Sequence, residues 1–229
     1  MREIVLDTET TGMDPFEGDR IIEIGAVELE NHLPTGRHLH LYINPERDVP
    51  ADAVAVHGLT EEFLKDKPVF AEIVTEFLDF VKDAKMVIHN AEFDVKFLNY
   101  ELKTLGFPSL DKRLVCDTLA MARRAFPGSP ANLDALCRRF NIDNSSRTLH
   151  GALLDSELLA EVYLELLGGR QHGMQLNAQN TGADDGSSGD TRHNYTGRTP
   201  RIVSANDKEL EAHASMLNDL NEAVWVTSK

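Results

Sequence analysis

The feature that most constrains the fold of this sequence is a change in hydrophobic periodicity early in the chain. Three runs rich in β-branched residues first alternate polar and apolar side chains with the period of two typical of strands, at 2–8, 20–30 and 37–43. Apolar residues then recur at helical spacing over 69–81, and a short apolar run at 85–89 predicts a buried strand. Successive strands followed by interleaved helices and strands predict an α/β domain with a mixed sheet.

The remainder of this domain continues the alternation. A helix is predicted from residue 92 to a close at Gly106, and a strand follows at 113–116. Three further helices are predicted at 117–126, 132–140 and 152–167. The pair Gly168-Gly169 ends the pattern, so the first domain is predicted to span residues 1–169.

Composition changes abruptly after that glycine pair. Residues 170–200 are predicted to be a flexible linker, because 177–200 are rich in Gly, Ser, Asn and Thr and hold almost no aliphatic side chains. Residues 201–229 regain hydrophobicity and predict an amphipathic helix that Asn206 and Glu209 begin with a capping box. Its apolar residues are Leu210, Leu217, Leu220 and Val224, followed by Trp225, the only tryptophan. A lone helix of this length is marginal in water, so the segment is either a frayed tail or, as we expect, a docking segment.

The net charge of −15, from 38 acidic and 23 basic residues, argues against a broad basic surface for nucleic acid. It does not exclude chemistry on a phosphodiester, because bound divalent cations cancel local acids. Cys116 and Cys137 lie in different segments without CxxC spacing, and we expect both to be buried reduced thiols. The sequence begins with neither a signal-peptide pattern nor an apolar span of about 18 residues. We therefore expect a cytoplasmic protein that does not enter a membrane.

The stretch IVLDTETTG, residues 4–12, ends an apolar strand with two acids, Asp7 and Glu9. Residues i and i+2 of a strand point to one face and lie roughly 6.6 Å apart. Carboxylates placed in this way repel and raise one another's pKa unless a cation neutralises them. The pair is therefore either a solvated strand end or part of a metal site. The following TTG predicts a tight turn whose small residues let a ligand approach the backbone.

Two later segments add polar groups of the same kind. Asp94 opens a helix just after His89 and Asn90, at a strand end where α/β sheets usually place ligands. Asp155 interrupts a leucine-rich helix, and His150 stands five residues before it. Taken singly, Asp155 could be an exposed helix position and His150 a capping or loop histidine. Together the four acids and the histidine form the inventory of a two-metal phosphodiesterase, with oxygen ligands for two Mg²⁺ or Mn²⁺ ions and a base for water.

Three motifs carry a resemblance to a known family. DTETTG at 7–12, HNAEFDVKFL at 89–98 and H-x₄-D at 150–155 resemble, in that order, the three motifs of the DEDDh class of 3′–5′ exonucleases, which share a ribonuclease-H-like fold. The resemblance covers residues 2–168. Within that class the chain is similar to the epsilon (proofreading) subunits of bacterial DNA polymerase III.

The resemblance implies a role for each motif residue. Asp7 would bridge two metal ions, Glu9 and Asp155 would hold the ion that activates water, and Asp94 would support the second ion, partly through water. His150 would take the proton, which suits the only side chain with an unperturbed pKa near neutrality. The implied reaction removes the terminal nucleotide from a DNA 3′ end as a nucleoside 5′-monophosphate.

Binding of a single-stranded end requires base stacking rather than base readout. VAVHGL at 54–59 resembles the segment with which the family wedges against the terminal base, so Val56, His57, Leu59 and Phe93 are candidates to contact DNA. Val56, Leu59 and Phe93 could equally be core residues. The expected substrate-binding residues are Asp7, Glu9, Thr10, Val56, His57, Leu59, His89, Asn90, Phe93 and Asp155.

Two protein partners are expected from the tail. QHGMQL at 171–176 resembles a sliding-clamp-binding motif, with Gln171, Met174 and Leu176 as its anchors. The segment 201–229 resembles the family's polymerase-binding tail, which would contact the polymerase alpha subunit through Leu210, Leu217 and Trp225.

Two other functions fit parts of the sequence. A stand-alone DEDDh exonuclease that trims RNA or short oligonucleotides would share the same five catalytic residues, and only the linker and hydrophobic tail argue against it. A binding module that kept the fold as a scaffold would be expected to have lost at least one of the five, and all are present.

Overall fold

The computed structural model of the chain describes residues 1–145, 147–168 and 205–219. These residues belong to two compact units, one within Met1–Leu176 and one within Asn177–Lys229, and each unit is described by itself. The predicted linker, 170–200, lies outside the described residues, so its boundaries stay a prediction.

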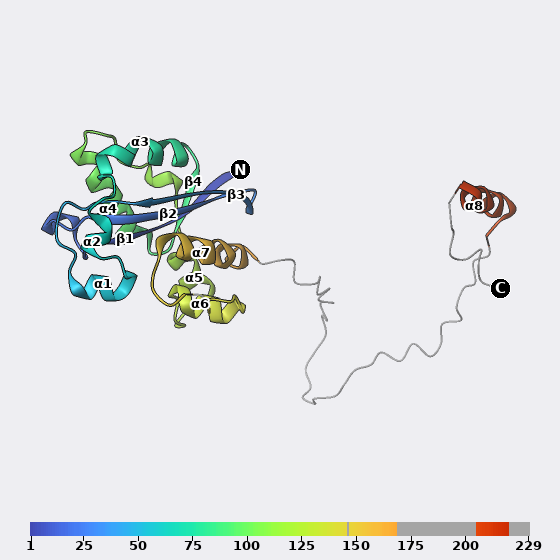
Figure 1. The fold of residues 1–229 in the computed structure, drawn as a ribbon. Helices are drawn as coiled ribbons and strands as arrows, with labels where there is room; N and C mark the ends of the chain where they lie inside the picture. Colours follow the sequence, from blue (N-terminus) through green and yellow to red (C-terminus); the bar gives the residue numbers. More distant parts are fainter. Residues whose placement is uncertain (146, 169–204, 220–229) are drawn as a thin grey trace, which may run out of the picture. The chain divides into compact units, whose positions relative to one another are not determined.

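The first unit interleaves strands and helices (Figure 1). The strands are β1 (Arg2–Thr10), β2 (Ile21–Glu30), β3 (Leu33–Tyr42), β4 (Lys85–Ile88) and β5 (Val115–Asp117). The α-helices are α1 (Ala51–His57), α2 (Glu61–Leu64), α3 (Phe70–Val81), α4 (Ala91–Thr104), α5 (Thr118–Ala125), α6 (Leu133–Phe140) and α7 (Ala152–Leu166). Short 3₁₀ turns occupy Pro15–Glu17 and Lys112–Leu114.

The sheet has the order β3-β2-β1-β4-β5, so β1 is its central strand. β1 pairs antiparallel with β2 and parallel with β4, which confirms the predicted mixed sheet. Successive residues of β1 pack into different cores, because side chains of a strand alternate between faces. Ile4 and Leu6 enter the core that includes α3 and α4, and Val5 enters the core that includes α6 and α7. Figure 1 shows α3 on one side of the sheet and α5, α6 and α7 on the other.

The hairpin between β2 and β3 is tighter than the sequence pattern predicts. The third strand was expected at 37–43, whereas β3 begins at Leu33. The turn lies at Asn31 and His32, which have φ values of 52° and 68°. Two such residues make the compact connection that suits a twisted hairpin. Pro34 is tolerated in β3 because this strand is at the edge of the sheet and needs no outward N–H.

Two short helices between β3 and α3 were not predicted from the sequence. α1 buries only His57, so it shows no apolar periodicity, and it ends at Gly58 with a φ of 77°. α2 is a single turn, and the Thr60 side chain accepts a hydrogen bond from the backbone N–H of Phe63 at 3.3 Å. Their capping residues were the only available signal.

The other predicted elements are confirmed to within a few residues. α4 closes with Gly106 at a φ of 79°, as its glycine predicted. Both cysteines are free; Cys137 is buried, but Cys116 is only half-buried, which corrects the expectation that both are buried. No helix in the described part of the chain is both long and apolar enough to cross a membrane.

The second unit contributes α8 (Asp207–Asp219). Its predicted capping box is confirmed: the backbone N–H of Asn206 donates to Oε2 of Glu209 at 2.8 Å, and the backbone N–H of Glu209 donates to Oδ1 of Asn206 at 3.0 Å. Leu210 is exposed and Leu217 is half-buried. The other predicted partner residues and apolar positions of the tail lie outside the described residues: Gln171, Met174, Leu176, Leu220, Val224 and Trp225.

The close approach of α7 to β2 depends on Gly25. A Cβ atom at this position would lie 2.1 Å from the backbone carbon of Ala152 and the backbone nitrogen of Leu153. The Ser156 hydroxyl also donates to the Gly25 carbonyl at 2.9 Å. Gly25 faces Asp7 across the β1–β2 ladder, so this contact brings the start of α7 beside the end of β1.

We predict that Gly25→Ala lowers the free energy of unfolding by about 3 kcal/mol, because a backbone rather than a flexible side chain would have to move. Urea unfolding of the full chain measures the change. Gly151→Ala is the control, since a Cβ there meets nothing within 4 Å. Equal stability of the Gly25→Ala variant and the wild type would contradict the proposed packing constraint.

Candidate active site

Asp7 and Glu9 lie near the C-terminal end of β1. Asp7 pairs with Gly25 and Glu9 pairs with Glu23 of β2. Both acids line one cleft of about 460 Å³, as their common strand face predicts. β4 runs parallel to β1, so the ends of both strands meet at the edge where α/β sheets usually bind ligands.

Asp94 is held against β1 by the residue between the two acids. It lies in the first turn of α4 and is 3% exposed. Its Oδ1 accepts hydrogen bonds from the backbone N–H of Thr8 at 3.1 Å and from the Thr8 hydroxyl at 2.7 Å. β1 thus supplies two carboxylates from its own face and positions a third through Thr8.

Asp155 is paired with an arginine that sequence reasoning missed. It lies in the first turn of α7, and the guanidinium of Arg147 binds it with two N–H groups, Nε to Oδ1 and Nη2 to Oδ2, the latter at 2.7 Å. Nη1 of Arg147 also donates to Oδ1 of Asp134 at 2.9 Å. The side chains of Arg147 and Asp155 are 8% and 5% exposed, so the pair is well shielded from water. Arg147 therefore supplies counter-charge directly to the acid cluster.

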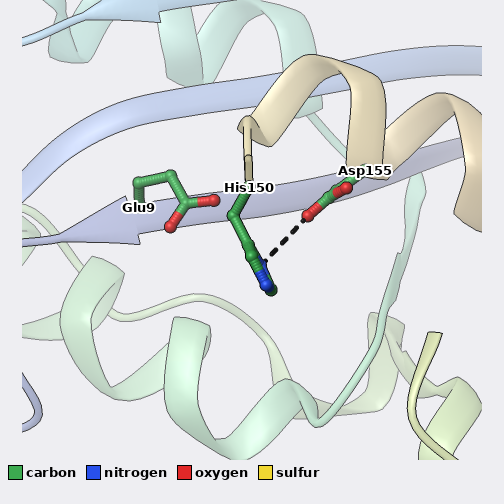
Figure 2. A group of neighbouring side chains, drawn as sticks. All are labelled: Glu9, His150 and Asp155. Carbon is green, nitrogen blue, oxygen red and sulfur yellow. Dashed lines mark ion pairs between the residues drawn. The ribbon is translucent and has the colours of Figure 1, made fainter. Parts of the chain in front are cut away.

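His150 lies beside this pair with its side chain half-exposed. Its backbone N–H donates to the Val56 carbonyl at 3.0 Å, which ties the loop before α7 to α1. Nδ1 lies 3.5 Å from Oδ2 of Asp155 (Figure 2) and 2.8 Å from Nη2 of Arg147. A guanidinium can only donate, so Nδ1 accepts from Arg147 and the proton of the neutral ring lies on Nε2.

The donor set fits hard divalent cations. One ligand atom each from Glu9, His150 and Asp155 lies within 4.8 Å of the other two (Figure 2). Asp7 and Asp94 line the same cleft, so the four motif carboxylates converge on it, and Asp134 is a fifth acid in its lining. Carboxylate oxygens are the ligands that Mg²⁺ and Mn²⁺ prefer in proteins. The fold therefore brings together the residues that the sequence pattern offers as metal ligands.

Burial raises the pKa of three of these acids. Burial, together with the charges of Asp94 and Glu9, raises the pKa of Asp7 well above its ordinary value. Burial, and next the charge of Glu23, raises the pKa of Glu9 to about 8. Burial also raises the pKa of Asp94 to about 7, although the hydrogen bonds from Thr8 oppose this change. Cations must displace protons from these groups, so metal affinity increases as pH rises toward 8.

The predicted substrate residues fall into two groups. His89, Asn90 and Phe93 line the cleft beside the acids. Val56 is 46% exposed and lines a second cavity of about 350 Å³, which shares Asp134, Arg147 and His150 with the cleft.

Thr10, His57 and Leu59 line neither of these cavities. The Thr10 hydroxyl donates to the Gly12 carbonyl at 2.6 Å and so holds the turn after β1. His57 is 6% exposed, and its Nδ1 accepts the backbone N–H of Leu59 at 3.0 Å. These contacts shape the backbone near the cleft, and direct contact of the three side chains with DNA stays a prediction.

Several residues that line the cleft were not singled out from the sequence: Met13, Thr8, Asn132, Leu133, Asp134, Arg147 and Leu159. Met13 is 74% exposed, in the turn that follows β1. Arg147 offered a signal, because it is the only basic residue between Arg139 and His150. Its partner could not be read from the sequence, since Asp134 and Asp155 both lie close to Arg147 along the chain.

We predict that Arg147→Leu lowers the free energy of unfolding of the metal-free protein by about 3 kcal/mol at pH 8, because Asp155 loses its buried counter-charge. The loss is smaller at pH 6, where Glu9 and Asp94, with pKa values of about 8 and about 7, are largely protonated and the cluster needs less counter-charge. Saturating Mn²⁺ raises the melting temperature of Arg147→Leu more than that of the wild type.

Arg138→Leu is the control for loss of one positive charge, because Arg138 is exposed on α6 and donates only to the Asp134 carbonyl at 3.3 Å. Thermal unfolding of both variants with chelator and with Mn²⁺ measures these effects. If Arg147→Leu matches Arg138→Leu under every condition, Arg147 does not serve as counter-charge for the cluster.

Comparison with known proteins identifies the family to which this chain belongs. The family described as Exonuclease matches residues 4–163. The DNA polymerase III subunit epsilon of Rickettsia conorii is 50% identical over 228 residues, which cover 98% of this chain and 99% of that protein. The protein of the same name from Escherichia coli K12 is 46% identical over 224 residues and covers 95% of this chain and 92% of that one.

Solved structures share the fold at lower identity. Exonuclease X in complex with a 5′-overhanging duplex DNA aligns with a TM-score of 0.57 and 24% identity, covering 72% of this chain and 90% of that chain. The nuclease domain of 3′hExo, a DEDDh family member bound to rAMP, aligns with a TM-score of 0.64 and 19% identity, covering 72% and 91%. This likeness confirms the predicted ribonuclease-H-like exonuclease fold. By the match over most of its length, the chain belongs to the exonuclease family and, within it, to the DNA polymerase III epsilon subunits.

Proposed function

We propose that this chain is the proofreading 3′–5′ exonuclease of a replicative DNA polymerase, which removes mismatched 3′-terminal nucleotides by metal-dependent hydrolysis. The observation that carries this proposal is the convergence on one cleft of the four motif carboxylates, from β1, α4 and α7, and of His150 from the loop before α7. An acid cluster of this density has no evident structural use in the fold, because buried like charges destabilise the folded state.

Asp7, Glu9, Asp94 and Asp155 would hold two divalent cations, Mg²⁺ or Mn²⁺. Cations bound there would lower the pKa of water and neutralise charge that develops on the phosphate and on the leaving 3′-oxygen. Thr8 keeps Asp94 oriented through two hydrogen bonds, and the packing of α7 on Gly25 keeps Asp155 opposite β1. The chain thus positions its ligands from rigid elements, as a catalytic site requires.

His150 is proposed to accept the proton of the attacking water. A ring nitrogen must offer a lone pair for this task, and Arg147 occupies the lone pair of Nδ1 in the described arrangement. Arg147 must therefore release Nδ1 before His150 can act as a base. The half-exposed ring is placed to pass the proton on to solvent.

The size of the cleft suits the end of a single strand rather than a duplex surface. A volume of about 460 Å³ accommodates little more than one nucleotide. Phe93 lies half-buried in the cleft wall and Val56 is exposed beside it, so both can contact a base without reading its edges. With a net charge of −15, the protein has little general attraction for DNA and would rely on its assembly to reach a primer end.

The rival function, trimming of RNA or short oligonucleotides, rests on the same catalytic residues. Solved structures of this fold contain different nucleic acids: exonuclease X is bound to a duplex DNA, and a 3′-exonuclease recognises the 3′ end of a histone mRNA stem-loop. The replicative function is favoured because the match to epsilon subunits continues through the tail to cover 98% of this chain.

We predict that the chain digests 5′-labelled single-stranded DNA from its 3′ end with Mg²⁺ or Mn²⁺, faster than matched RNA, and releases nucleoside 5′-monophosphates. Asp155→Asn lowers this rate by about 10³-fold, because one metal ligand is lost while the shape of the side chain is kept. Glu76→Gln, an exposed change of one charge on α3, serves as the control. Length-resolved digestion with and without chelator provides the measurement.

Three outcomes would contradict the proposal. Faster cleavage of RNA would favour the trimming enzyme, absence of cleavage together with absence of Mn²⁺ binding would favour a scaffold, and wild-type activity of Asp155→Asn would remove the assigned site.

The two tail segments are proposed to attach the exonuclease to its assembly. Residues 201–229 would bind the polymerase alpha subunit, and 171–176 would bind the sliding clamp. Support comes from the exposed Leu210 on α8 and from the names of the relatives that match the tail. Attachment at two points would hold the cleft at high effective concentration near a primer end.

We predict that Leu210→Glu with Trp225→Glu abolishes co-purification with the polymerase alpha subunit and leaves clamp binding intact. Met174→Ala with Leu176→Ala has the opposite effect, so each variant is the control of the other. Digestion of free single strands is unchanged in both. Loss of both interactions in either variant, or of neither, would refute separate docking segments.

A further inference from the structure

A third cavity continues the active-site cleft in a second direction. It has a volume of about 500 Å³ and shares His89, Asn90 and Asn132 with the cleft. We call it the Arg123 arm, after Arg123 of α5, which lines it together with Ser129 and Ala131. The cavity that contains Val56 shares three other residues with the cleft, so the two side cavities join it through different walls.

The two side cavities differ in charge. The Arg123 arm contains no acidic residue in its lining, and Arg123 is its only arginine or lysine. Among the described residues, no carboxylate lies within ion-pair distance of Arg123, whereas Arg2, Arg20, Arg47 and Arg147 each pair with an acid. Arg124, Arg138 and Arg139 also form no ion pair among the described residues, so Arg123 is distinguished by its position beside the cleft.

The wall of the arm is fixed and presents hydrogen-bond donors. His89 is held by the Thr118 hydroxyl, which lies 2.9 Å from its Nδ1. Oδ1 of Asn132 caps α6 by accepting the backbone N–H of Ala135 at 2.8 Å, which leaves the amide N–H₂ of Asn132 for a ligand. The Ser129 hydroxyl and the Arg123 guanidinium add further donors. Such a set matches the oxygens of a phosphodiester.

The direction of the substrate strand follows from the chemistry. An enzyme that releases the 3′-terminal nucleotide cuts at the last phosphodiester, and the terminal nucleoside beyond it carries no further phosphate. Any additional phosphate site beside the cleft must therefore serve the strand on the 5′ side of the cut. The Val56 cavity presents exposed Val56 and Leu149 and contains Asp134, so it suits an uncharged nucleoside better than a phosphate.

We infer that the Arg123 arm binds the phosphodiester backbone of the substrate on the 5′ side of the bond to be cut, with Arg123 as its charged contact. The inference rests on the proposed exonuclease function and extends it, because it assigns a polarity to the path of the strand. It also predicts that the arm increases activity on an oligonucleotide but not on a single nucleotide ester.

Arg123→Gln in the full chain tests the arm, with Arg124→Gln as a matched control. Arg124 is the next residue of α5, is also exposed, and lines none of the three cavities, so both variants lose the same charge. Two substrates are compared in each protein: a single-stranded DNA ten-mer and an aryl ester of thymidine 5′-monophosphate, which carries only the phosphate to be cut.

The ratio of kcat/KM for the ten-mer to kcat/KM for the ester is expected to fall about tenfold in Arg123→Gln, as for loss of a charged hydrogen bond. The same ratio is unchanged in Arg124→Gln. The slope of log(kcat/KM) for the ten-mer against log salt falls by about 0.7 in Arg123→Gln alone, which corresponds to one phosphate contact on a single strand. Equal ratios in the two variants would overturn the inference.

Uncharged methylphosphonate linkages, placed one at a time in the ten-mer, locate the contact. At one linkage on the 5′ side of the cut, the substitution slows the wild type and Arg124→Gln but slows Arg123→Gln no further. Additive effects at every linkage would refute the contact. A wild type that cleaves neither substrate would overturn the proposed function and this inference together, whereas a wild type active on both, with no difference between the variants, would overturn the inference alone.

Discussion

Mutual repulsion among buried carboxylates is the constraint on which the rest of this structure depends. Asp7, Glu9, Asp94 and Asp155 line one cleft, and burial raises the pKa of the first three. The raised pKa values mean that these acids bind protons more readily than free carboxyls do. Arg147, whose guanidinium forms a bidentate pair with Asp155, supplies counter-charge to the cluster. Like charges in this cleft thus destabilise the fold locally, as is common at functional sites.

The order of the strands explains how acids from segments at different distances along the chain come together at that cleft. β1 is the central strand, flanked by β2 on one side and β4 on the other, so the elements on both faces converge on its C-terminal end. α4 follows β4 directly and delivers Asp94. α7 comes much later in the sequence and packs on the backbone of Gly25. This contact places Asp155 beside the end of β1.

Charge distribution reconciles an acidic protein with a polyanionic substrate. A net charge of −15 gives no general attraction for DNA, so local groups must supply it. Arg123 and the donors around it are positioned beside the cleft, while the acids are concentrated inside it. Under the proposed function, partners bound by the tail would supply affinity for a primer end, and the cleft would supply the chemistry.

Local patterns were sufficient for most of the elements, because period two and period 3.6 reflect which face of a strand or helix is buried. These patterns did not predict α1, because its buried residues show no helical period. They also misplaced the start of β3, because a strand at the edge of the sheet tolerates Pro34. The five motif residues could be selected from the sequence because their order and spacing in three separate segments resemble the three exonuclease motifs, whereas each residue taken singly could have an ordinary structural role.

The sequence by itself determined the alternation of elements and the residues that form the acid cluster, since each follows from neighbouring residues. It also predicts a polar linker at 170–200, which lies outside the described residues. Only the tertiary structure decided that Arg147 pairs with Asp155 and that Arg123 lines a continuation of the cleft. Only it decided that Thr10, His57 and Leu59 lie away from the cleft surface. These placements depend on contacts between segments far apart in the chain, which no local pattern encodes.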